Sequence, residues 1–290
     1  MKSKVYFTGD ISQNGLLKIY DAINHPLKGK IAVKLSSGEP GGHNFLNPQM
    51  IKPLVDKLNG TIVECNTAYQ GKRNTTSAHW QTLKDPGFLD IAPCDIMDEE
   101  GEISLPVNGG FHLSENYVGR NIEKYDSILM LSHFKGHLMA GLGGALKNMS
   151  IGIASSHGKI HIHTAGKSTT FDDAFNTKQD DFLESMADAD KSVIEFIGRD
   201  NIVYINVANN LSVDCDCDSH PAPPEMADIG IFASIDPVAV DKACVDAVYN
   251  SKDEGKKALI ERMESRHGIR TVEAAAELGL GSLEYEIITV

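Results

Sequence analysis

The chain has 290 residues, of which 40 are acidic and 27 are basic, giving a formal net charge of −13. This length corresponds to one large domain or two small ones, and the ordinary apolar content of 41% excludes a fibrous or disordered chain. The acidic balance argues against a nucleic-acid-binding protein, because binding to the phosphate backbone needs a basic surface. The sequence lacks a run of about 18 apolar residues that would span a bilayer, so no membrane protein is expected.

Residues 1–10 combine a basic start with a brief apolar stretch, which predicts a first strand and not a signal peptide. The five cysteines are an odd number. Cys215 and Cys217 are too close for an ordinary disulfide, and their spacing favours thiols or metal ligands in a reducing compartment. We therefore expect a cytoplasmic protein.

Short β-branched runs alternate with helical patterns along the whole chain. Strands are expected at Val5–Thr8, Ile31–Leu35, Thr61–Glu64, Ser127–Leu131, Ile202–Val207 and Ile229–Ala233. Helices are expected at Ser12–Ile23, Pro48–Leu58, Thr76–Leu83, Asp181–Ile197, Pro237–Tyr249, Lys256–Arg266 and Thr271–Leu278. The alternation predicts an α/β fold with mainly parallel sheet and flanking helices.

Domain boundaries are only weakly marked in the sequence. We expect one domain over residues 1–290, and a division into two lobes, 1–125 and 126–290, with a cleft between them stays open. Asp236 before Pro237 predicts a helix N-cap followed by a proline in the first helical turn. In open α/β sheets ligands bind beyond the carboxyl ends of the strands, so chemistry is expected in the loops there.

Residues 131–148 form the stretch that is densest in candidate site residues; it follows an apolar strand and precedes a helix-like run. Its glycines can let the backbone approach an anion closely, and Gly141, Gly143 and Gly144 are the candidates for cofactor binding. The segment matches neither common nucleotide-binding glycine loop. A tight, closely packed strand-to-helix turn is the alternative, but Lys135 and Lys147 in the same segment favour a site.

Two groups of histidines follow each other in the sequence. His133 and His137 are four residues apart, a spacing that on a helix would let both hold one metal ion. A second group contains His157, His161 and His163. His161 and His163 alternate around an isoleucine, as on a strand with both side chains on one face, and a polar edge-strand face is the alternative.

Residues 213–218 place two thiols among three carboxylates. Cys215 and Cys217 could ligate one soft or borderline metal ion or form a redox pair. Two cysteines cannot complete a four-thiolate site, so a metal would need help from histidines or from Cys65 or Cys94. Cys244 lies in an apolar helical pattern and is expected in the core.

Three segments, 132–155, 204–217 and 228–249, resemble the domain of unknown function 362 family of uncharacterised "Fe–S centre" proteins. Many members of that family carry an inserted ferredoxin module with two four-cysteine motifs. Here no cysteine lies between His163 and Tyr204, so no ferredoxin-type cluster is expected within this chain.

A fainter resemblance connects residues 137–163 with lactate racemase-like proteins, which use a nickel pincer nucleotide tethered to a lysine. The similar positions are His137, Ala140, Gly141, Gly143, Gly144 and Lys147, with His163 following sixteen residues after the lysine. The resemblance implies that Lys147 contacts a phosphorylated cofactor, that His163 ligates metal and that His137 shuttles a proton. Upstream, only a loose Gly71–Thr76 with His79 corresponds to that family's motifs.

Basic residues follow several of the expected strands, which predicts a positive pocket inside an acidic protein. They are Lys34, Lys72, Arg73, Lys135 and Lys147. Such a pocket would take a small anionic substrate or cofactor, and Arg73 would bind a carboxylate or phosphate through two hydrogen bonds.

Together these patterns predict a metal- or cofactor-dependent protein that performs redox or proton-transfer chemistry on an anionic substrate, as an oxidoreductase or isomerase. The alternative is a metal or electron carrier, or a binding module, that works with a separate ferredoxin partner. The catalytic candidates are His137, Lys135 and Lys147. The cofactor-binding candidates are Gly141, Gly143, Gly144, Lys147 and Arg73. The metal candidates are Cys215, Cys217, His133, His137 and His163, for iron, zinc or nickel without distinction.

Overall fold

The computed structural model describes residues 2–290, and its centre is an eight-stranded sheet in the order β12-β1-β11-β10-β7-β2-β3-β4. The strands of this sheet are β1 (Ser3–Thr8), β2 (Ile31–Lys34), β3 (Thr61–Glu64), β4 (Cys94–Ile96), β7 (Ser127–His133), β10 (Ile202–Ala208), β11 (Gly230–Ser234) and β12 (Tyr285–Thr289). Two separate hairpins consist of β5 (Glu102–Pro106) with β6 (Glu115–Gly119) and β8 (Lys135–His137) with β9 (Gly141–Gly143).

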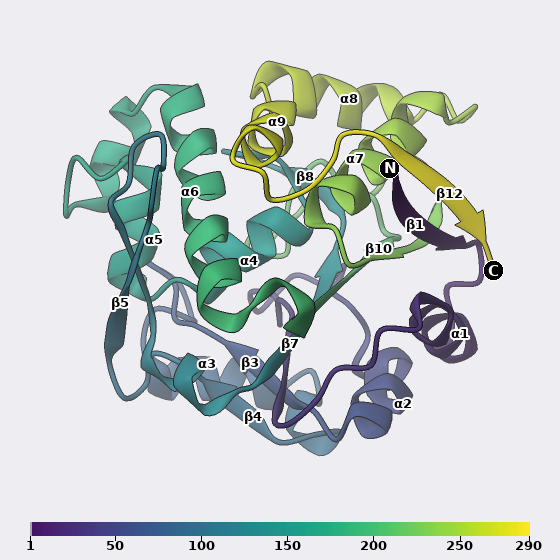
Figure 1. The fold of residues 1–290 in the computed structure, drawn as a ribbon, viewed down its shortest axis with the longest axis horizontal. Helices are drawn as coiled ribbons and strands as arrows, with labels where there is room; N and C mark the ends of the chain where they lie inside the picture. Colours follow the sequence, from purple (N-terminus) through teal and green to yellow (C-terminus); the bar gives the residue numbers. More distant parts are fainter. Residues whose placement is uncertain (1) are drawn as a thin grey trace.

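Helices pack on both sides of the sheet, as Figure 1 shows. They are α1 (Gln13–Ile23), α2 (Pro48–Leu58), α3 (Thr76–Lys84), α4 (Ala145–Ile153), α5 (Ser156–His163), α6 (Gln179–Ile197), α7 (Pro237–Asn250), α8 (Lys256–Ser265) and α9 (Ile269–Glu277). Short 3₁₀ turns occur at Phe88–Asp90, Arg120–Lys124, Phe171–Asn176 and Arg199–Asn201. The predicted α/β fold with a mainly parallel sheet is confirmed.

The pairing directions explain where the strand ends meet. Strands β10, β7, β2, β3 and β4 pair in parallel, and β12 pairs in parallel with β1. Strand β11 runs antiparallel to both of its neighbours. The first and last strands of the chain therefore lie side by side at one edge of the sheet, with the two termini at opposite ends of that pair (Figure 1). The carboxyl ends of β2, β3, β7 and β10 open toward one region, where a ligand site is expected.

Strand β7 shows how the sheet separates two cores. Its alternate residues Ile128 and Met130 pack into the core beneath α4, α6, α7 and α9, whereas Leu129 and Leu131 face the core beneath α1, α2 and α3. All four side chains are fully buried. A strand that is apolar on both faces suits a central position covered by helices on both sides.

The expected strands and helices are present with end points shifted by a few residues. The predicted N-cap is also confirmed, because Asp236 accepts the backbone N–H of Ala239 at 2.9 Å. The strand expected around His161 and His163 is wrong: these residues belong to helix α5. Ser155 begins that helix by accepting the N–H of Gly158 at 2.9 Å, and this cap overrides the alternating pattern.

Within residues 2–290 no helix is long and apolar enough to cross a membrane.

Candidate functional site

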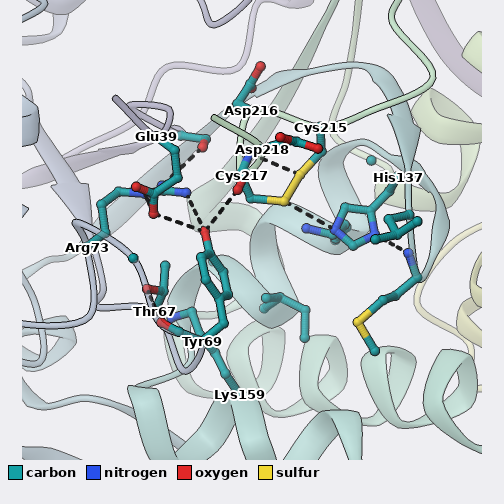
Figure 2. A pocket seen from close by; sticks show the side chains of 18 of the residues that line it. Glu39, Thr67, Tyr69, Arg73, His137, Lys159, Cys215, Asp216, Cys217 and Asp218 are labelled. Carbon is teal, nitrogen blue, oxygen red and sulfur yellow. Dashed lines mark hydrogen bonds and ion pairs between the residues drawn. A yellow bond between two sulfur atoms is a disulfide. The ribbon is translucent and has the colours of Figure 1, made fainter. Parts of the chain in front are cut away.

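A cavity of about 610 Å³ opens at the carboxyl ends of β2, β3, β7 and β10. Figure 2 shows side chains from distant parts of the chain converging on it. The five basic residues expected in a positive pocket, Lys34, Lys72, Arg73, Lys135 and Lys147, all line this cavity. Carboxylates line it as well, so the hydrogen bonds decide which positive charges remain for a ligand.

Glu64, at the end of β3, neutralises much of the charge on one side of the cavity. Its carboxylate lies 2.8 Å from the ammonium of Lys34 and 3.5 Å from the guanidinium of Arg73, and it accepts the N–H of Ser37 at 2.7 Å. Burial alone would raise the pKa of Glu64, but Lys34 and Arg73 lower it to about 2. The charge of Lys34 is therefore compensated within the protein by its ion pair with Glu64.

Arg73 is buried and held by a second carboxylate. Its guanidinium lies 3.2 Å from Glu39 and donates to the hydroxyl of Tyr69 at 3.0 Å. The Tyr69 hydroxyl also donates to the backbone carbonyl of Cys217 at 3.4 Å, which connects the guanidinium to the cysteine segment (Figure 2). Arg73 thus lines the cavity with much of its hydrogen-bonding capacity already used.

Asp216 forms the third internal ion-pair group. Its buried carboxylate contacts Nδ1 of His133 at 2.9 Å and the ammonium of Lys135 at 2.5 Å. Burial alone would raise the pKa of Asp216, but His133 and Lys135 lower it well below its usual range. The other ring nitrogen of His133 lies 2.6 Å from the carbonyl oxygen of Asn209, so both nitrogens face hydrogen-bond acceptors. A metal-binding role for His133 would require one of these bonds to break.

Three lysines in the cavity lining have no carboxylate partner within ion-pair distance among residues 2–290: the exposed Lys72 and the more buried Lys147 and Lys159. Lys147 extends from the first turn of α4, and Lys159 extends from α5 and donates to the carbonyl oxygen of Ala154 at 2.5 Å. Burial lowers the pKa of Lys147 to about 7, and the neighbouring cations Lys135 and Lys34 act in the same direction. Burial also lowers the pKa of Lys159. These two ammonium groups are available to an anionic ligand.

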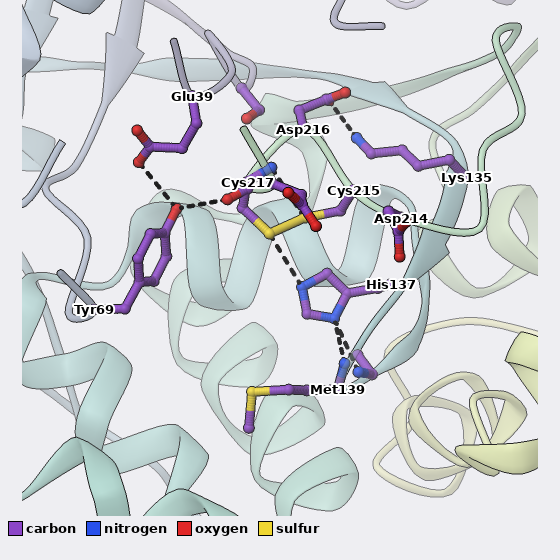
Figure 3. The surroundings of a disulfide bond; sticks show 12 residues. Glu39, Tyr69, Lys135, His137, Met139, Asp214, Cys215, Asp216 and Cys217 are labelled. Carbon is purple, nitrogen blue, oxygen red and sulfur yellow. Dashed lines mark hydrogen bonds and ion pairs between the residues drawn. A yellow bond between two sulfur atoms is a disulfide. The ribbon is translucent and has the colours of Figure 1, made fainter. Parts of the chain in front are cut away.

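Cys215 and Cys217 form a disulfide, drawn in Figure 3, so the expectation that they are too close for one is wrong. The tight turn that brings them together has the N–H of Cys217 pointing at Sγ of Cys215, 3.1 Å away. Cys65 lines the cavity as a buried thiol, and burial raises its pKa. Cys94 lies in β4, outside the cavity lining, and Cys244 lies in the core as expected.

His137 lies beside this disulfide with its ring orientation fixed by the backbone. Its Nδ1 accepts the N–H groups of Met139 at 3.1 Å and Ala140 at 2.9 Å. Because Nδ1 accepts both bonds, the hydrogen of the neutral ring is assigned to Nε2. Nε2 lies 3.8 Å from Sγ of Cys217 (Figure 3). Burial lowers the pKa of His137 well below its ordinary value, and Lys147 acts in the same direction.

His163 also lines the cavity, but its ring hydrogen is on Nδ1, whereas that of His137 is on Nε2. Its Nδ1 lies 2.6 Å from the carbonyl oxygen of Lys159 and must donate to it, which leaves the lone pair on Nε2. The ring stacks on Phe182 with the centroids 4.6 Å apart. Burial lowers the pKa of His163 to about 4, so the ring is neutral near pH 7.

The glycines of the 131–148 segment have separate positions. Gly143 and Gly144 line the cavity, whereas Gly141 lies outside the lining and turns the β8–β9 hairpin with a φ of +77°. A Cβ on Gly144 would lie 2.5 Å from the carboxylate of Asp241. That carboxylate accepts the N–H groups of Ala145 and Leu146 at 2.8 and 3.0 Å, so the first turn of α4 already holds an anion.

Sequence reasoning missed several residues of the cavity, including Glu39, Glu64, Tyr69 and Lys159. Lys159 precedes His163 by four residues, so recognising α5 as a helix would have placed both on one face. Apolar side chains also line the cavity. Among them, Phe175 is 70% exposed and Leu138 is 55% exposed, which leaves apolar surface next to the charged interior.

Comparisons with known proteins agree with the resemblance seen in the sequence. The model of a family described as "Domain of unknown function (DUF362)" matches residues 31–246. Among curated proteins none matches this chain.

Two solved structures are similar in fold. The lactate racemase apoprotein from Thermoanaerobacterium thermosaccharolyticum is 12% identical, with a TM-score of 0.47 over 86% of this chain and 57% of that chain. A protein from Thermotoga maritima is 13% identical, with a TM-score of 0.45 over 91% of this chain and 58% of that chain. The present chain thus spans less than two thirds of either, and neither likeness carries an argument about its activity.

Proposed function

The chain belongs to the family described as a domain of unknown function (DUF362), and from the contents of its cavity we propose that it is an enzyme that binds a small organic anion and transfers a proton or electrons at that anion. One observation carries the proposal. A single cavity holds Lys147 and Lys159, which have no carboxylate partner in the described chain, two neutral histidines whose ring hydrogens are on different nitrogens, and a cysteine pair.

The two lysines supply the attraction for an anion. Lys34, Lys135 and Arg73 are compensated by Glu64, Asp216 and Glu39, so the positive charge left for a ligand belongs to Lys147 and Lys159, together with the exposed Lys72. Within a partly dehydrated cavity such a charge attracts a carboxylate or phosphate more strongly than it would in water.

The histidines supply two different functions toward that anion. With its lone pair on Nε2, His163 can accept a proton from the substrate as a general base. With its hydrogen on Nε2, neutral His137 donates a hydrogen bond to the negative charge that develops on the substrate. A neutral imidazole donor of this kind stabilises an anion without transferring the proton, because loss of its N–H would create an imidazolate.

Two measurements test this function in sequence. Titration calorimetry with a panel of small mono- and dicarboxylates, with inorganic phosphate as a further probe, measures anion binding. Proton NMR in D₂O then measures hydrogen exchange at the carbon next to the carboxylate or carbonyl group of each bound compound. Binding with exchange supports an enzyme. Binding without exchange or redox turnover favours the carrier function with a separate ferredoxin partner, and absence of binding overturns both.

A metal-dependent form of this function rests on ligand atoms of His137, Cys215 and Cys217 that lie within 4.8 Å of one another. These atoms do not fit a metal ion in the disulfide form, because both sulfurs are bonded to each other and Nε2 of His137 carries a hydrogen. Reduction would provide two thiolates suited to iron, zinc or nickel. We therefore derive no catalytic step through a metal.

A further inference from the structure

The Cys215–Cys217 disulfide lies in the cavity but takes no part in the proton transfer described above. We propose that it is a reversible redox centre that accepts electrons from small anionic thiols, with Cys217 as the sulfur that is attacked. This inference rests on the anion-binding part of the proposed function and specifies its redox chemistry.

The two sulfurs differ in accessibility. Both cysteines line the cavity, but Cys215 is buried, with 6% of its surface exposed, whereas Cys217 is only partly buried. A thiolate that enters the cavity therefore meets Cys217 first. Exchange proceeds by direct attack of a thiolate on one sulfur of the disulfide, so access selects the sulfur that is attacked.

The two sulfurs also have different hydrogen-bond donors. Sγ of Cys215 accepts the backbone N–H of Cys217 at 3.1 Å, and Sγ of Cys217 faces Nε2 of His137 at 3.8 Å. Since backbone N–H groups hold Nδ1 of His137 as an acceptor, Nε2 keeps its hydrogen and points it at Cys217 (Figure 3). Each sulfur thus has a donor that would stabilise it as a thiolate after the bond breaks.

The backbone and side chains around the disulfide are held by hydrogen bonds to other parts of the chain. The side chain of Asp216 is held by His133 and Lys135, and its backbone carbonyl accepts the N–H of Glu39 at 2.8 Å. The carbonyl of Cys217 accepts the hydroxyl of Tyr69. These bonds do not involve the sulfurs, so they can keep the cysteines close to each other and to His137 after reduction.

The exchange balances in two steps. A substrate thiolate attacks Sγ of Cys217; a bond forms between the two sulfurs, the Cys215–Cys217 bond breaks, and its electron pair leaves on Cys215, which takes a proton from solvent. A second substrate thiolate attacks the substrate sulfur of this mixed disulfide and releases the substrate disulfide together with the Cys217 thiolate, which accepts the hydrogen bond from His137. Two thiolates are oxidised and one disulfide is reduced, with one proton taken up.

The first experiment identifies the attacked sulfur. Cys215→Ser and Cys217→Ser proteins are treated with glutathione disulfide, and the mixed disulfide is followed by intact mass. We expect the adduct to form on Cys217 in the Cys215→Ser protein at least tenfold faster than on Cys215 in the Cys217→Ser protein. Equal rates, or a faster reaction at Cys215, would overturn the assignment.

The reduced wild-type protein provides the same test without a cysteine substitution. Limited alkylation with iodoacetamide followed by peptide mapping should modify Cys217 before Cys215. His137→Phe should slow reduction of the wild-type disulfide by roughly tenfold, because the departing Cys217 thiolate loses its donor. His157→Phe is the matched control, since His157 lies on α5 outside the cavity lining and pairs with Glu102.

The second experiment separates this proposal from the anion-binding function. Reduction is compared with mercaptoacetate and 2-mercaptoethanol at equal thiolate concentration, in wild-type and Lys147→Met proteins. A wild-type preference for mercaptoacetate that is lost in Lys147→Met supports both the anion-binding function and the redox centre. Reduction without preference for the charged thiol would overturn the anion-binding part alone. Failure of both thiols to reduce the disulfide, while carboxylates still bind by calorimetry, would overturn the redox centre alone.

Discussion

His163 donates its Nδ1 hydrogen to the carbonyl oxygen of Lys159, 2.6 Å away and one helical turn earlier in α5, and so presents Nε2 to the cavity as an acceptor. If this nitrogen removes the substrate proton, His163→Gln should lower hydrogen exchange at the substrate carbon by roughly 10²- to 10⁴-fold, the usual contribution of a general base. NMR in D₂O gives the rate, and calorimetry should find that the anion still binds.

His161→Gln is the control for this substitution, because His161 lies on the same helix but outside the cavity lining. Equal losses in the two variants would indicate a general effect on α5 and would contradict the assignment of His163 as base.

Lys147 should make anion binding depend on pH in the neutral range. Burial, with the neighbouring Lys135 and Lys34, lowers the pKa of its ammonium to about 7. The charged amine binds the anion, so affinity is full below pH 7 and falls by roughly tenfold per pH unit above it. Calorimetry at a series of pH values from about 6 to about 9, which includes this pKa, measures how the affinity falls.

A bound anion raises the pKa of the amine, so the observed midpoint should move upward as ligand concentration increases. Lys147→Met should bind weakly with no such midpoint, and Lys252→Met, at an exposed position, should behave as wild type. A wild-type slope in Lys147→Met would assign the pH dependence to another group.

The sequence predicts the central elements of the fold well because they carry strong local signals. β7 contains the apolar run 128–131 and β10 the run 202–205, and the helix from Pro237 has both its N-cap and its proline. Short strands such as β4 and β12 carry no comparable signal, since their pairing depends on neighbours far along the chain.

The types of residue in the site were predictable from the sequence, but the ion pairs between its basic residues and carboxylates were not. Positive residues after strands predicted that Lys135 and Lys147 share a pocket, because parallel strands end together. Which lysine keeps its charge available was not predictable: Asp216, the partner of Lys135, lies 81 residues away in the sequence. The hydrogen positions on His137 depend likewise on backbone N–H groups whose direction is set only by the folded hairpin.

Asp216 should contribute strongly to stability through its buried contacts with His133 and Lys135. Asp216→Asn removes the negative charge and leaves the positive charge of Lys135 without compensation. Breaking a buried pair in this way costs about 3–5 kcal/mol of unfolding free energy. Urea denaturation at pH 7 measures the loss. Asp200→Asn, at an exposed position, should cost under about 0.5 kcal/mol, and a similarly small loss in Asp216→Asn would contradict the buried pair.

Glu64 should make the protein sensitive to acid. Its pKa is lowered to about 2, below its ordinary value of 4.5, because the attraction of Lys34 and Arg73 for the carboxylate outweighs the effect of burial. A carboxyl group whose pKa is lower in the folded protein stabilises the fold at every pH above its pKa in the unfolded chain. This stabilisation is lost as the pH falls from about 4.5 toward 2. The contribution is on the order of 3 kcal/mol.

Unfolding free energies measured across that range should therefore fall more steeply in wild type than in Glu64→Gln, which is already destabilised at neutral pH. Parallel curves for the two proteins would show that other carboxyl groups cause the acid sensitivity.

Metal binding should depend on the redox state of Cys215 and Cys217. The disulfide offers no thiolate, and Nε2 of His137 keeps its hydrogen because Nδ1 accepts two backbone N–H groups. We expect no stoichiometric uptake of zinc, nickel or ferrous ion by the oxidised protein. After anaerobic reduction the two thiolates become available, and one ion per chain should bind with release of protons. Elemental analysis after gel filtration measures both states, with the Cys215→Ser/Cys217→Ser double variant as control. Uptake by the double variant would place the ion at other ligands, such as His112, Asp181 and Glu184. Uptake by the oxidised protein that is lost in the double variant would contradict the hydrogen position assigned to His137.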